Sequence, residues 1–597
     1  MPEIPEDPRK EYEVRLAARR AKAGELEGRH IALGNARLAV AAIAVVIAWL
    51  TFGRHAISGW WLLAPAAAFA VLAIIHGRVL RARRRAERSI QFYEQGLARI
   101  DDRWHGTGPT GERFDDPAHP YAEDLDLFGN GSLFQLLSTA RLRTGEETLA
   151  RWLSGPAAPG EVESRHGAIH ELRPRLNLRE DAALLGEEAQ SGINPGALAA
   201  WAEQPIVFDS KALRHGSWML AVLAVAGLVV WAVFSVPEFF LAVFLAESIL
   251  FLRIRRRVKQ VVEAVGEPAY GLALLAGVLA RFERERFESP RLVALRKELD
   301  VEGVPPSVQV ARLNRLMEML ESSEHVLMRA IGPVVLYVPQ LAFAIEAWRK
   351  KSGPFVRKWL AAVGEMEALC SLANYTYEHP ADVFPEFVEG GPCYEGQALA
   401  HPLLPEGRAV RNDVRLCGEL HALIVSGSNM SGKSTLLRTV GVNAVLAMAG
   451  APVRARGLRL SRLALGASIR TLDSLQGGTS RFYAEIKRIR ALVDLGGGPL
   501  PLLFLLDELL NGTNSHDRRI GAEAILRGLL DRGAIGLLTT HDLALTEIAS
   551  ALEPRTSNVH FEDHLEDGHI TFDYRLRPGV VQKSNALELM RSIGLEV

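Results

Sequence analysis

One glycine-rich segment constrains the fold of this chain more than any other feature. Residues 427–435 read Gly-Ser-Asn-Met-Ser-Gly-Lys-Ser-Thr, after the apolar run 422–425 and before Leu436. This order of strand, glycine turn and helix start is typical of a phosphate-binding P-loop. The glycines let the backbone curl so that its N–H groups point at phosphate oxygens, and the following helix adds its positive end. We therefore predict an α/β nucleotide-binding domain around this segment.

The side chains of this segment predict a nucleotide and a metal ion as ligands. Lys433 is long enough to reach β- and γ-phosphates, and the Ser434 hydroxyl can ligate Mg²⁺. We expect ATP with Mg²⁺. The residues expected to bind it are Gly427, Ser428, Asn429, Met430, Ser431, Gly432, Lys433, Ser434 and Thr435.

A second apolar run ends in two acids, which is a Walker B pattern. Residues 502–506 precede Asp507 and Glu508. Asp507 is expected to hold Mg²⁺ together with Ser434, directly or through water, and Glu508 to orient or deprotonate the attacking water. We predict Glu508 and Lys433 as catalytic residues.

Two further segments offer residues whose roles stay open. The apolar run 535–540 ends at His541, which either senses the γ-phosphate or is purely structural. Residues 477–485 open a helix with small polar side chains, and Ser480 either caps it or faces a γ-phosphate across a dimer interface. We include His541 among the expected catalytic residues and Ser480 among those that bind nucleotide.

Four apolar runs, in two pairs, predict two membrane hairpins. They span residues 38–53 and 57–75, then 216–235 and 239–252. Each is near the ~17–25 residues that a spanning helix needs. Arginine and lysine gather outside both pairs, so the positive-inside rule predicts cytoplasmic termini and a cytoplasmic ATPase. Two pairs of buried core helices are the alternative, and Glu247 inside the fourth run favours it for the second pair.

The composition excludes a strongly basic protein surface for binding nucleic acid. The net charge is −1 with 23% charged residues, although local basic patches remain possible. The cysteines, at positions 370, 393 and 417, show no ligand spacing. They fit a reducing compartment, and we expect no further role for them.

The motifs, in this order, resemble those of the MutS family of DNA mismatch-repair ATPases. Residues 427–435 are similar to its G-P-N-M-G-G-K-S-T, and the Asn-Met pair is much more specific than a generic P-loop. Residues 507–514 resemble D-E-I-G-R-G-T-S and 539–541 resemble A-T-H. Ser480, Phe482 and Glu485 match S-T-F-x-x-E, while 133–153 and 365–373 resemble parts of the helical core.

The resemblance implies a dimeric ATPase with composite sites. Each site would take Lys433, Ser434, Asp507, Glu508 and His541 from one subunit and Ser480 from the other. The implied fold is an α/β P-loop NTPase domain of ABC/MutS type after an all-α core and lever region, to which the apolar runs add two transmembrane hairpins. We predict segments at 1–105 (first hairpin), 106–210 (helical core), 211–260 (second hairpin), 261–390 (lever) and 391–597 (ATPase).

The sequence also departs from the family pattern. It has no room for the mismatch-reading and connector domains, and the family's adenine-stacking aromatic is missing near Ala409 and Val410. Leu510 and Asn511 replace Gly and Arg after the Walker B acids. We therefore expect a membrane-anchored MutS-related ATPase at the inner membrane.

Partners follow from the same resemblance. We expect membrane lipid, a second copy of the chain, and mismatched or branched DNA at the helical region. A membrane-associated assembly or signalling ATPase without DNA binding is the alternative, because the charge is near neutral. A transporter is a third possibility, which four short spans disfavour.

Overall fold

The computed structural model describes residues 7–190, 194–300, 303–428, 430–470, 481–511, 513–566 and 569–581. The chain divides into two compact units. The first comprises Met1–Gly108 with Tyr377–His379, and the second comprises Pro109–Thr376 with Pro380–Val597.

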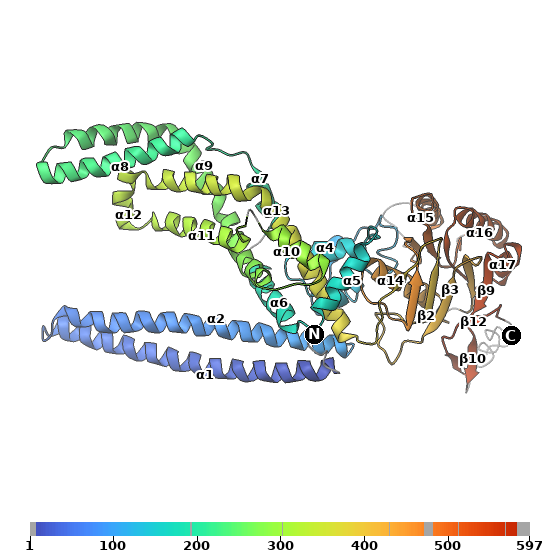
Figure 1. Ribbon diagram of the computed structural model, residues 1–597. Helices are drawn as coiled ribbons and strands as arrows, with labels where there is room; N and C mark the ends of the chain where they lie inside the picture. Colours follow the sequence, from blue (N-terminus) through green and yellow to red (C-terminus); the bar gives the residue numbers. More distant parts are fainter. Residues whose placement is uncertain are drawn as a thin grey trace. The chain divides into compact units, whose positions relative to one another are not determined.

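The first unit is a long helical hairpin (Figure 1). Helix α1 (Pro8–Ala48) starts at Asp7, whose carboxylate accepts hydrogen bonds from two backbone N–H groups, and continues as a π-helical turn, η1 (Trp49–Gly53). A short 3-10 helix, η2 (Gly59–Leu62), leads into α2 (Leu63–Ile100). Because α1 and α2 pack along their length, the hairpin needs few other contacts to hold its shape.

A buried ion pair closes the base of this unit. Both guanidinium nitrogens Nε and Nη2 of Arg99 lie 2.6 Å from the carboxylate of Glu378. The Tyr12 hydroxyl donates to the same carboxylate at 3.2 Å. Since a buried charge is stable only when it is paired and hydrogen-bonded, these three groups must stay together.

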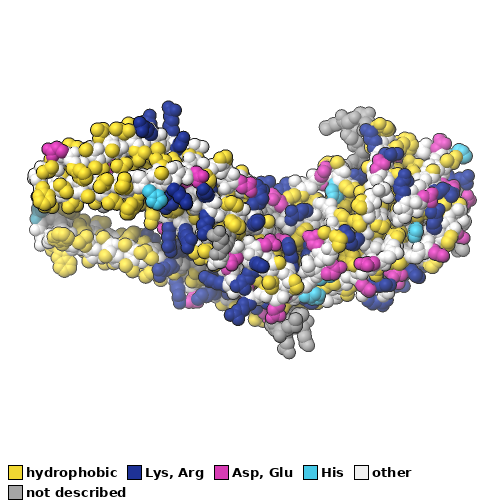
Figure 2. All heavy atoms as spheres, turned by 45° about the horizontal axis from the view of Figure 1, so that its top comes forward, with side chains coloured by type: hydrophobic (Ala, Val, Ile, Leu, Met, Phe, Trp, Pro, Cys, Tyr) yellow, Lys and Arg dark blue, Asp and Glu magenta, His cyan; other side chains and the backbone are white. Residues whose placement is uncertain are grey.

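The tip of the hairpin exposes apolar side chains. Leu38 is 71% exposed, Val45 69% and Trp60 79%. Figure 2 shows such side chains gathered over the ends of the helices, away from the charged surface. Pro8–Gly53 and Gly59–Ile100 are each long and apolar enough to cross a membrane. The predicted run 38–53 lies within the first, and the run 57–75 begins two residues before the second.

The second unit begins with short helices that carry the helical core. They are η3 (Glu112–Phe114), α3 (Leu133–Leu137), α4 (Arg143–Leu153), α5 (Glu161–Leu172), α6 (Leu176–Gln190) and α7 (Pro195–Glu203). Later helices complete it: α10 (Pro290–Leu299), α11 (Pro306–Ser322), α12 (Val326–Ile331), η4 (Gly332–Val335) and α13 (Tyr337–Glu378). The apolar stretch 334–338 contains the end of η4 and the start of α13, which are joined by Leu336 in a left-handed conformation.

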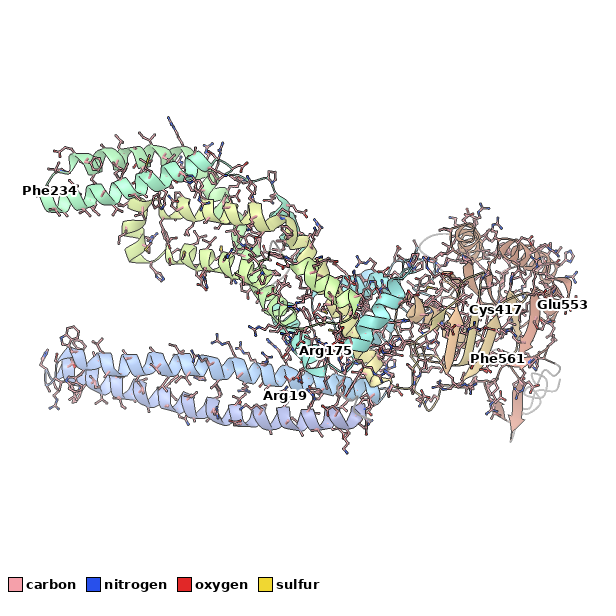
Figure 3. The ribbon with its side chains drawn as sticks, viewed as in Figure 1. Arg19, Arg175, Phe234, Cys417, Glu553 and Phe561 are labelled. Atoms are coloured by element: carbon pink, nitrogen blue, oxygen red, sulfur yellow. A yellow bond between two sulfur atoms is a disulfide. The ribbon has the colours of Figure 1, made fainter. Side chains whose placement is uncertain are left out.

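A second helical hairpin projects from this core. Helix α8 (Lys211–Phe234) is capped by Ser210, and α9 (Glu238–Glu283) returns after a turn (Figure 1). Phe234 marks the tip in Figure 3. Lys211–Phe234 is long and apolar enough to span a membrane, whereas α9 does not meet that criterion. The reason is that its apolar part, 239–252, is short and runs directly into arginines.

The C-terminal part is an α/β domain. Its six-stranded sheet has the order β12-β9-β4-β8-β7-β6, parallel except for β12. The strands are β4 (Ala422–Ser426), β6 (Ala464–Ser468), β7 (Leu502–Leu506), β8 (Ile535–Thr540), β9 (Thr556–His560) and β12 (Arg577–Pro578). Central strands β4, β7 and β8 are buried along their whole length, as parallel strands covered on both faces are.

Helices and two smaller sheets complete this domain. The helices are α14 (Lys433–Ala449), α15 (Arg481–Leu495), α16 (Ser515–Leu530), η5 (Leu543–Thr546) and α17 (Glu547–Ala551). A four-stranded sheet has the order β1-β5-β2-β3, from β1 (Glu386–Phe387), β2 (Tyr394–Leu399), β3 (Asn412–Leu416) and β5 (Gly457–Leu460). Strands β10 (Asp563–Glu566) and β11 (His569–Phe572) form an antiparallel pair.

Candidate active site

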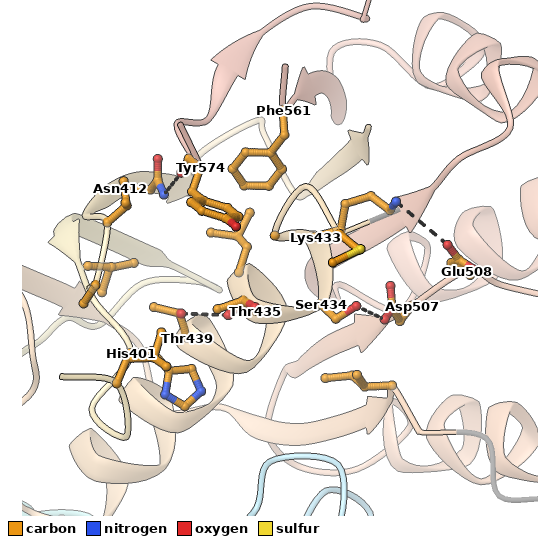
Figure 4. A pocket seen from close by; sticks show the side chains of 18 of the residues that line it. His401, Asn412, Lys433, Ser434, Thr435, Thr439, Asp507, Glu508, Phe561 and Tyr574 are labelled. Atoms are coloured by element: carbon orange, nitrogen blue, oxygen red, sulfur yellow. Dashed lines mark hydrogen bonds and ion pairs between the residues drawn. The ribbon is translucent and has the colours of Figure 1, made fainter. Parts of the chain in front are cut away.

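The carboxyl ends of three parallel strands converge on one cavity. Strand β4 lies beside β8, with Ser426 opposite Thr540, and β7 lies on the other side of β8. The segments that follow these strands therefore meet at one edge of the sheet, which is where α/β sheets bind ligands. The cavity has a volume of about 930 Å³ (Figure 4).

Lys433 is the first residue of α14 and points into the loop that precedes it. Gly432, with φ +101°, is the left-handed turn that lets the helix start there. The Lys433 ammonium donates to the carbonyl oxygens of Gly427 at 2.8 Å and Ser428 at 2.9 Å. Burial lowers the pKa of Lys433, and the nearby carboxylates of Glu508 and Asp507 oppose that shift. A charged lysine held inside a loop of backbone groups suits a polyanionic ligand.

Ser434 and Asp507 form the pair predicted to hold a metal ion. The Ser434 hydroxyl donates to Asp507 Oδ2 at 2.5 Å, across from α14 to the end of β7. Thr539 Oγ1 donates to the other oxygen of Asp507 and accepts the backbone N–H of Glu508 at 3.1 Å. Thr539 thus fixes both acids, a role that the sequence did not indicate. Hydroxyl and carboxylate oxygens together suit Mg²⁺.

Glu508 is the centre of a small network. Its Oε1 lies 3.1 Å from Nδ1 of His541 and 3.8 Å from Nζ of Lys433. Its Oε2 accepts a hydrogen bond from the side chain of Asn511 at 2.8 Å. The backbone of Glu508 has φ +48°, a costly conformation for a residue with a side chain, and such strain gathers at functional sites.

Aromatic side chains line the cavity next to the loop, since a Cβ atom at Gly432 would lie 3.1 Å from the Tyr574 ring. Phe561 and Tyr574 both face it (Figure 4). Asn412 holds Tyr574 in place, because its Nδ2 donates to the Tyr574 carbonyl at 3.0 Å and its Oδ1 accepts from Leu576 N–H at 2.8 Å. The sequence predicted no aromatic near Ala409 and Val410, which line the same cavity. The aromatic surface comes instead from residues more than 150 positions later in the chain, so no local pattern could reveal it.

The structure brings five of the ten expected nucleotide-binding residues to the lining of this cavity. Met430, Gly432, Lys433, Ser434 and Thr435 line it, together with Asp507 and Glu508. Ser431 is buried beneath the loop, with its Oγ close to Gly427. Asn429 and Ser480 lie outside the described residues, so their predicted roles stay predictions.

A second group of contacts, made by Asp124 and by helix α15, holds the segments next to the site in place. Asp124, from the helical part of the unit, accepts the backbone N–H groups of Ile469 at 2.8 Å and Arg470 at 2.7 Å. It also pairs with Arg488 of α15 at 2.6 Å. Glu485 of the same helix accepts the N–H of Leu510 at 2.6 Å. Helix α15 is therefore tied both to the helical core and to the segment after the Walker B acids.

The structure contradicts the expectation that none of the three cysteines has a further role, because two of them are bonded to each other. Cys393 and Cys417 form a disulfide, with their Cα atoms 4.4 Å apart. They face each other because β2 and β3 are antiparallel and Tyr394 pairs with Leu416. The disulfide links the two strands at one end of the β2–β3 pair. The segment that joins these strands at the other end contains His401 and Ala409, which line the cavity. Figure 3 labels Cys417 in this sheet.

The family comparison assigns this domain. Residues 423–596 match the family model described as MutS domain V. The C-terminal part of the chain is thus similar to MutS domain V. MutS domain V is an ATPase domain, and here it follows a mostly helical region.

Similar proteins agree with this assignment. The chain is 31% identical over 253 residues to a DNA mismatch repair protein MutS of Natronomonas pharaonis, covering 40% of this chain and 28% of that protein. It is 28% identical over 301 residues to an endonuclease MutS2 of Pelotomaculum thermopropionicum, covering 49% and 35%. These matches show similarity to MutS and MutS2 proteins over part of the chain. The chain spans only about a third of the length of such relatives.

Proposed function

We propose that this protein is a membrane-anchored, MutS-type ATPase that hydrolyses ATP at composite sites between two copies of the chain. The observation that carries the proposal is the convergence of Lys433, the Ser434–Asp507 pair and Glu508 on one cavity within a MutS domain V. Coupling of the ATP cycle to DNA is the further part of the proposal.

The residues of the cavity fit ATP with Mg²⁺. Lys433 and the backbone of the loop around it would hold the β- and γ-phosphates, and Ser434 with Asp507 would hold the metal ion. When bound, Mg²⁺ neutralises charge on the phosphates. Tyr574 and Phe561 offer flat apolar surfaces to the base.

Glu508 is the group best placed to act on water. Its carboxylate lies beside Lys433 and His541, and Asn511 fixes one of its oxygens. From this position it would accept a proton from the attacking water or orient it. His541 would hold the Glu508 carboxylate from the other side. Ser480 of a second copy would complete the site.

Membrane anchoring is supported by the two hairpins. Three of their helices are long and apolar enough to span a bilayer. Arginines follow the apolar part of each hairpin, and by the positive-inside rule they support a cytoplasmic side for the helical core and the ATPase domain. Flotation of the full chain with lipid vesicles tests this: the protein should float and resist extraction by carbonate, and recovery as soluble protein would contradict anchoring.

ATP hydrolysis is tested with variants of single site residues. Purified full chain in detergent should release phosphate from ATP, and Glu508→Gln should lower kcat by about 10²-fold or more with little change in nucleotide affinity. Lys433→Ala should instead weaken nucleotide binding itself. Equal turnover in the wild type and Glu508→Gln would refute the ATPase assignment.

DNA binding is supported by the names of the relatives, which include DNA mismatch repair protein and endonuclease. Titration of duplex, mismatched and branched DNA at several salt concentrations tests it. Binding that weakens steeply with salt and changes with ATP supports the proposal. Absence of binding at low salt favours the alternative, an assembly or signalling ATPase of the membrane.

A further inference from the structure

A second cavity lies where the α8–α9 hairpin meets α12 and the start of α13. Its volume is about 650 Å³. One wall follows α9 from Phe244 to Val262, which is roughly 27 Å of helix at 1.5 Å per residue. The other wall runs from Met328 to Pro339. The cavity is therefore long, and one of its walls is a helix whose first part belongs to the proposed membrane hairpin.

The chemistry of the lining changes along α9. Phe244, Phe251 and Leu252 line the part that belongs to the apolar run 239–252. Arg255 and Lys259 line the part that follows it, and Arg329 of α12 adds a third cation. An apolar stretch that passes into a cluster of cations is complementary to an amphiphile with an anionic headgroup.

One buried polar group that lines the cavity indicates that the cavity can hold a ligand. Glu247 lines it and is only 1% exposed. Neither of its carboxylate oxygens has a hydrogen-bond partner among the described residues. A buried carboxyl without a partner is costly, so a ligand that offers one would stabilise this wall. Glu247 lies two helical turns from Arg255, on the apolar side, and its carboxyl, when protonated, can donate a hydrogen bond to an ester carbonyl of a lipid whose phosphate lies at Arg255.

We propose that this cavity binds an anionic glycerophospholipid, an inference that rests on the membrane anchoring proposed above. Arg255, Lys259 and Arg329 hold the phosphate, and an acyl chain lies along Phe244 and Phe251. Glu247 faces the glycerol-ester region. A bound lipid would contact both α9 of the hairpin and the start of α13. Because α13 continues to Glu378, just before the ATPase domain, the lipid would stabilise the packing of the hairpin on this helix.

Photocrosslinking in nanodiscs tests the site. The probe is phosphatidylglycerol with a photoreactive acyl chain, compared with the same acyl chain on phosphatidylcholine, and labelled peptides are mapped by mass spectrometry. Phosphatidylglycerol should preferentially label peptides that contain 244–262 and 328–339. Arg255→Ala with Arg329→Ala should reduce this labelling by roughly fivefold for each cation removed.

Matched controls separate this inference from membrane insertion itself. Arg256→Ala with Arg257→Ala removes two exposed cations of the same helix that do not line the cavity, and labelling should stay unchanged. Labelling of α1, α2 and α8 without the cavity peptides, or equal labelling by both probes, overturns the lipid site while anchoring stands. Absence of labelling on all helices, together with failure to float with vesicles, overturns both.

Discussion

The side chain of Asn511 donates a hydrogen bond to the Glu508 carboxylate, with 2.8 Å between Nδ2 and Oε2. This contact joins a residue that departs from the family pattern to the acid expected to act on water. The amide fixes one carboxylate oxygen, so the other, Oε1, stays directed at His541 and Lys433. Asn511 therefore contributes directly to the candidate active site.

Asn511→Ala should lower kcat for ATP by about 10-fold, because a contact of about 1–1.5 kcal/mol that orients Glu508 is lost. The Kd for a non-hydrolysable ATP analogue should stay within about twofold, since Lys433 and Ser434 are untouched. Phosphate-release kinetics and calorimetry measure the two effects. His516→Ala, an exposed change nearby, serves as the control. A weakened analogue affinity with normal kcat would show that Asn511 acts in binding instead.

Tyr574→Ala should weaken ATP binding by about 5- to 150-fold, the range that loss of base–aromatic stacking produces. Tyr574 is 42% exposed, so its loss should leave the fold intact. Tyr574→Phe keeps the ring and should bind ATP almost normally. Inorganic tripolyphosphate has no base, and its affinity should be the same in all three proteins. Equal losses for ATP and tripolyphosphate would place Tyr574 at the phosphates and not at the base.

The two ends of the site differ in how far sequence could predict them. Gly427–Thr435 and Asp507–Glu508 are local patterns, and the chemistry of each follows from residue types at fixed spacing. Tyr574 reaches the cavity only because the chain returns after β11, and Cys393 meets Cys417 only because two strands pair. Such contacts depend on tertiary structure. Helix α9 was also only partly predicted: hydropathy identified its apolar run but not that the run continues as one helix of 46 residues.

Asp124→Asn should loosen the segment around β6 and α15. The change removes the charge that pairs with Arg488. While the amide oxygen can still accept from the two backbone N–H groups, the amide NH2 faces the guanidinium, so the local free energy of opening should fall by roughly 2–4 kcal/mol. Hydrogen exchange of peptides covering 464–470 and 481–495 measures it.

Asp126→Asn is the matched control for this change. Asp126 pairs with Arg470 and Arg438 but is partly exposed, and Asn tolerates its left-handed backbone. Its removal should cost only about 0–1 kcal/mol. Equal exchange in Asp124→Asn and Asp126→Asn would contradict the supporting role of Asp124.

Glu367 should make stability depend on pH. Burial raises the pKa of this carboxyl from 4.5 to about 8, although the backbone N–H of Leu142 opposes the shift. The folded protein therefore holds a proton that the unfolded chain has released at neutral pH. This contribution is complete below about pH 4.5 and is lost as the pH rises through about 8.

Melting temperatures of the purified chain between pH 5 and 9 test this prediction. The difference between the wild type and Glu367→Gln should shift by several degrees across that range, to the disadvantage of the wild type at high pH. Glu365→Gln, on the same helix but paired with Arg291, should follow the wild-type profile. Parallel profiles for the wild type and Glu367→Gln would exclude Glu367 as the source.

Reduction of the Cys393–Cys417 bridge should lower the melting temperature of the ATPase domain, because closing a ring of about 25 residues contributes about 3 kcal/mol in the chain-entropy account. A double Cys393→Ser, Cys417→Ser variant should melt at the lower temperature with or without reductant.

Disulfides are uncommon in reducing compartments, so a cytoplasmic ATPase domain also predicts that both thiols are free in cells and pair only after purification. Alkylation in intact cells, followed by mass spectrometry, measures the fraction bridged. A fully bridged pair in growing cells would contradict the cytoplasmic orientation, whatever the melting temperatures show.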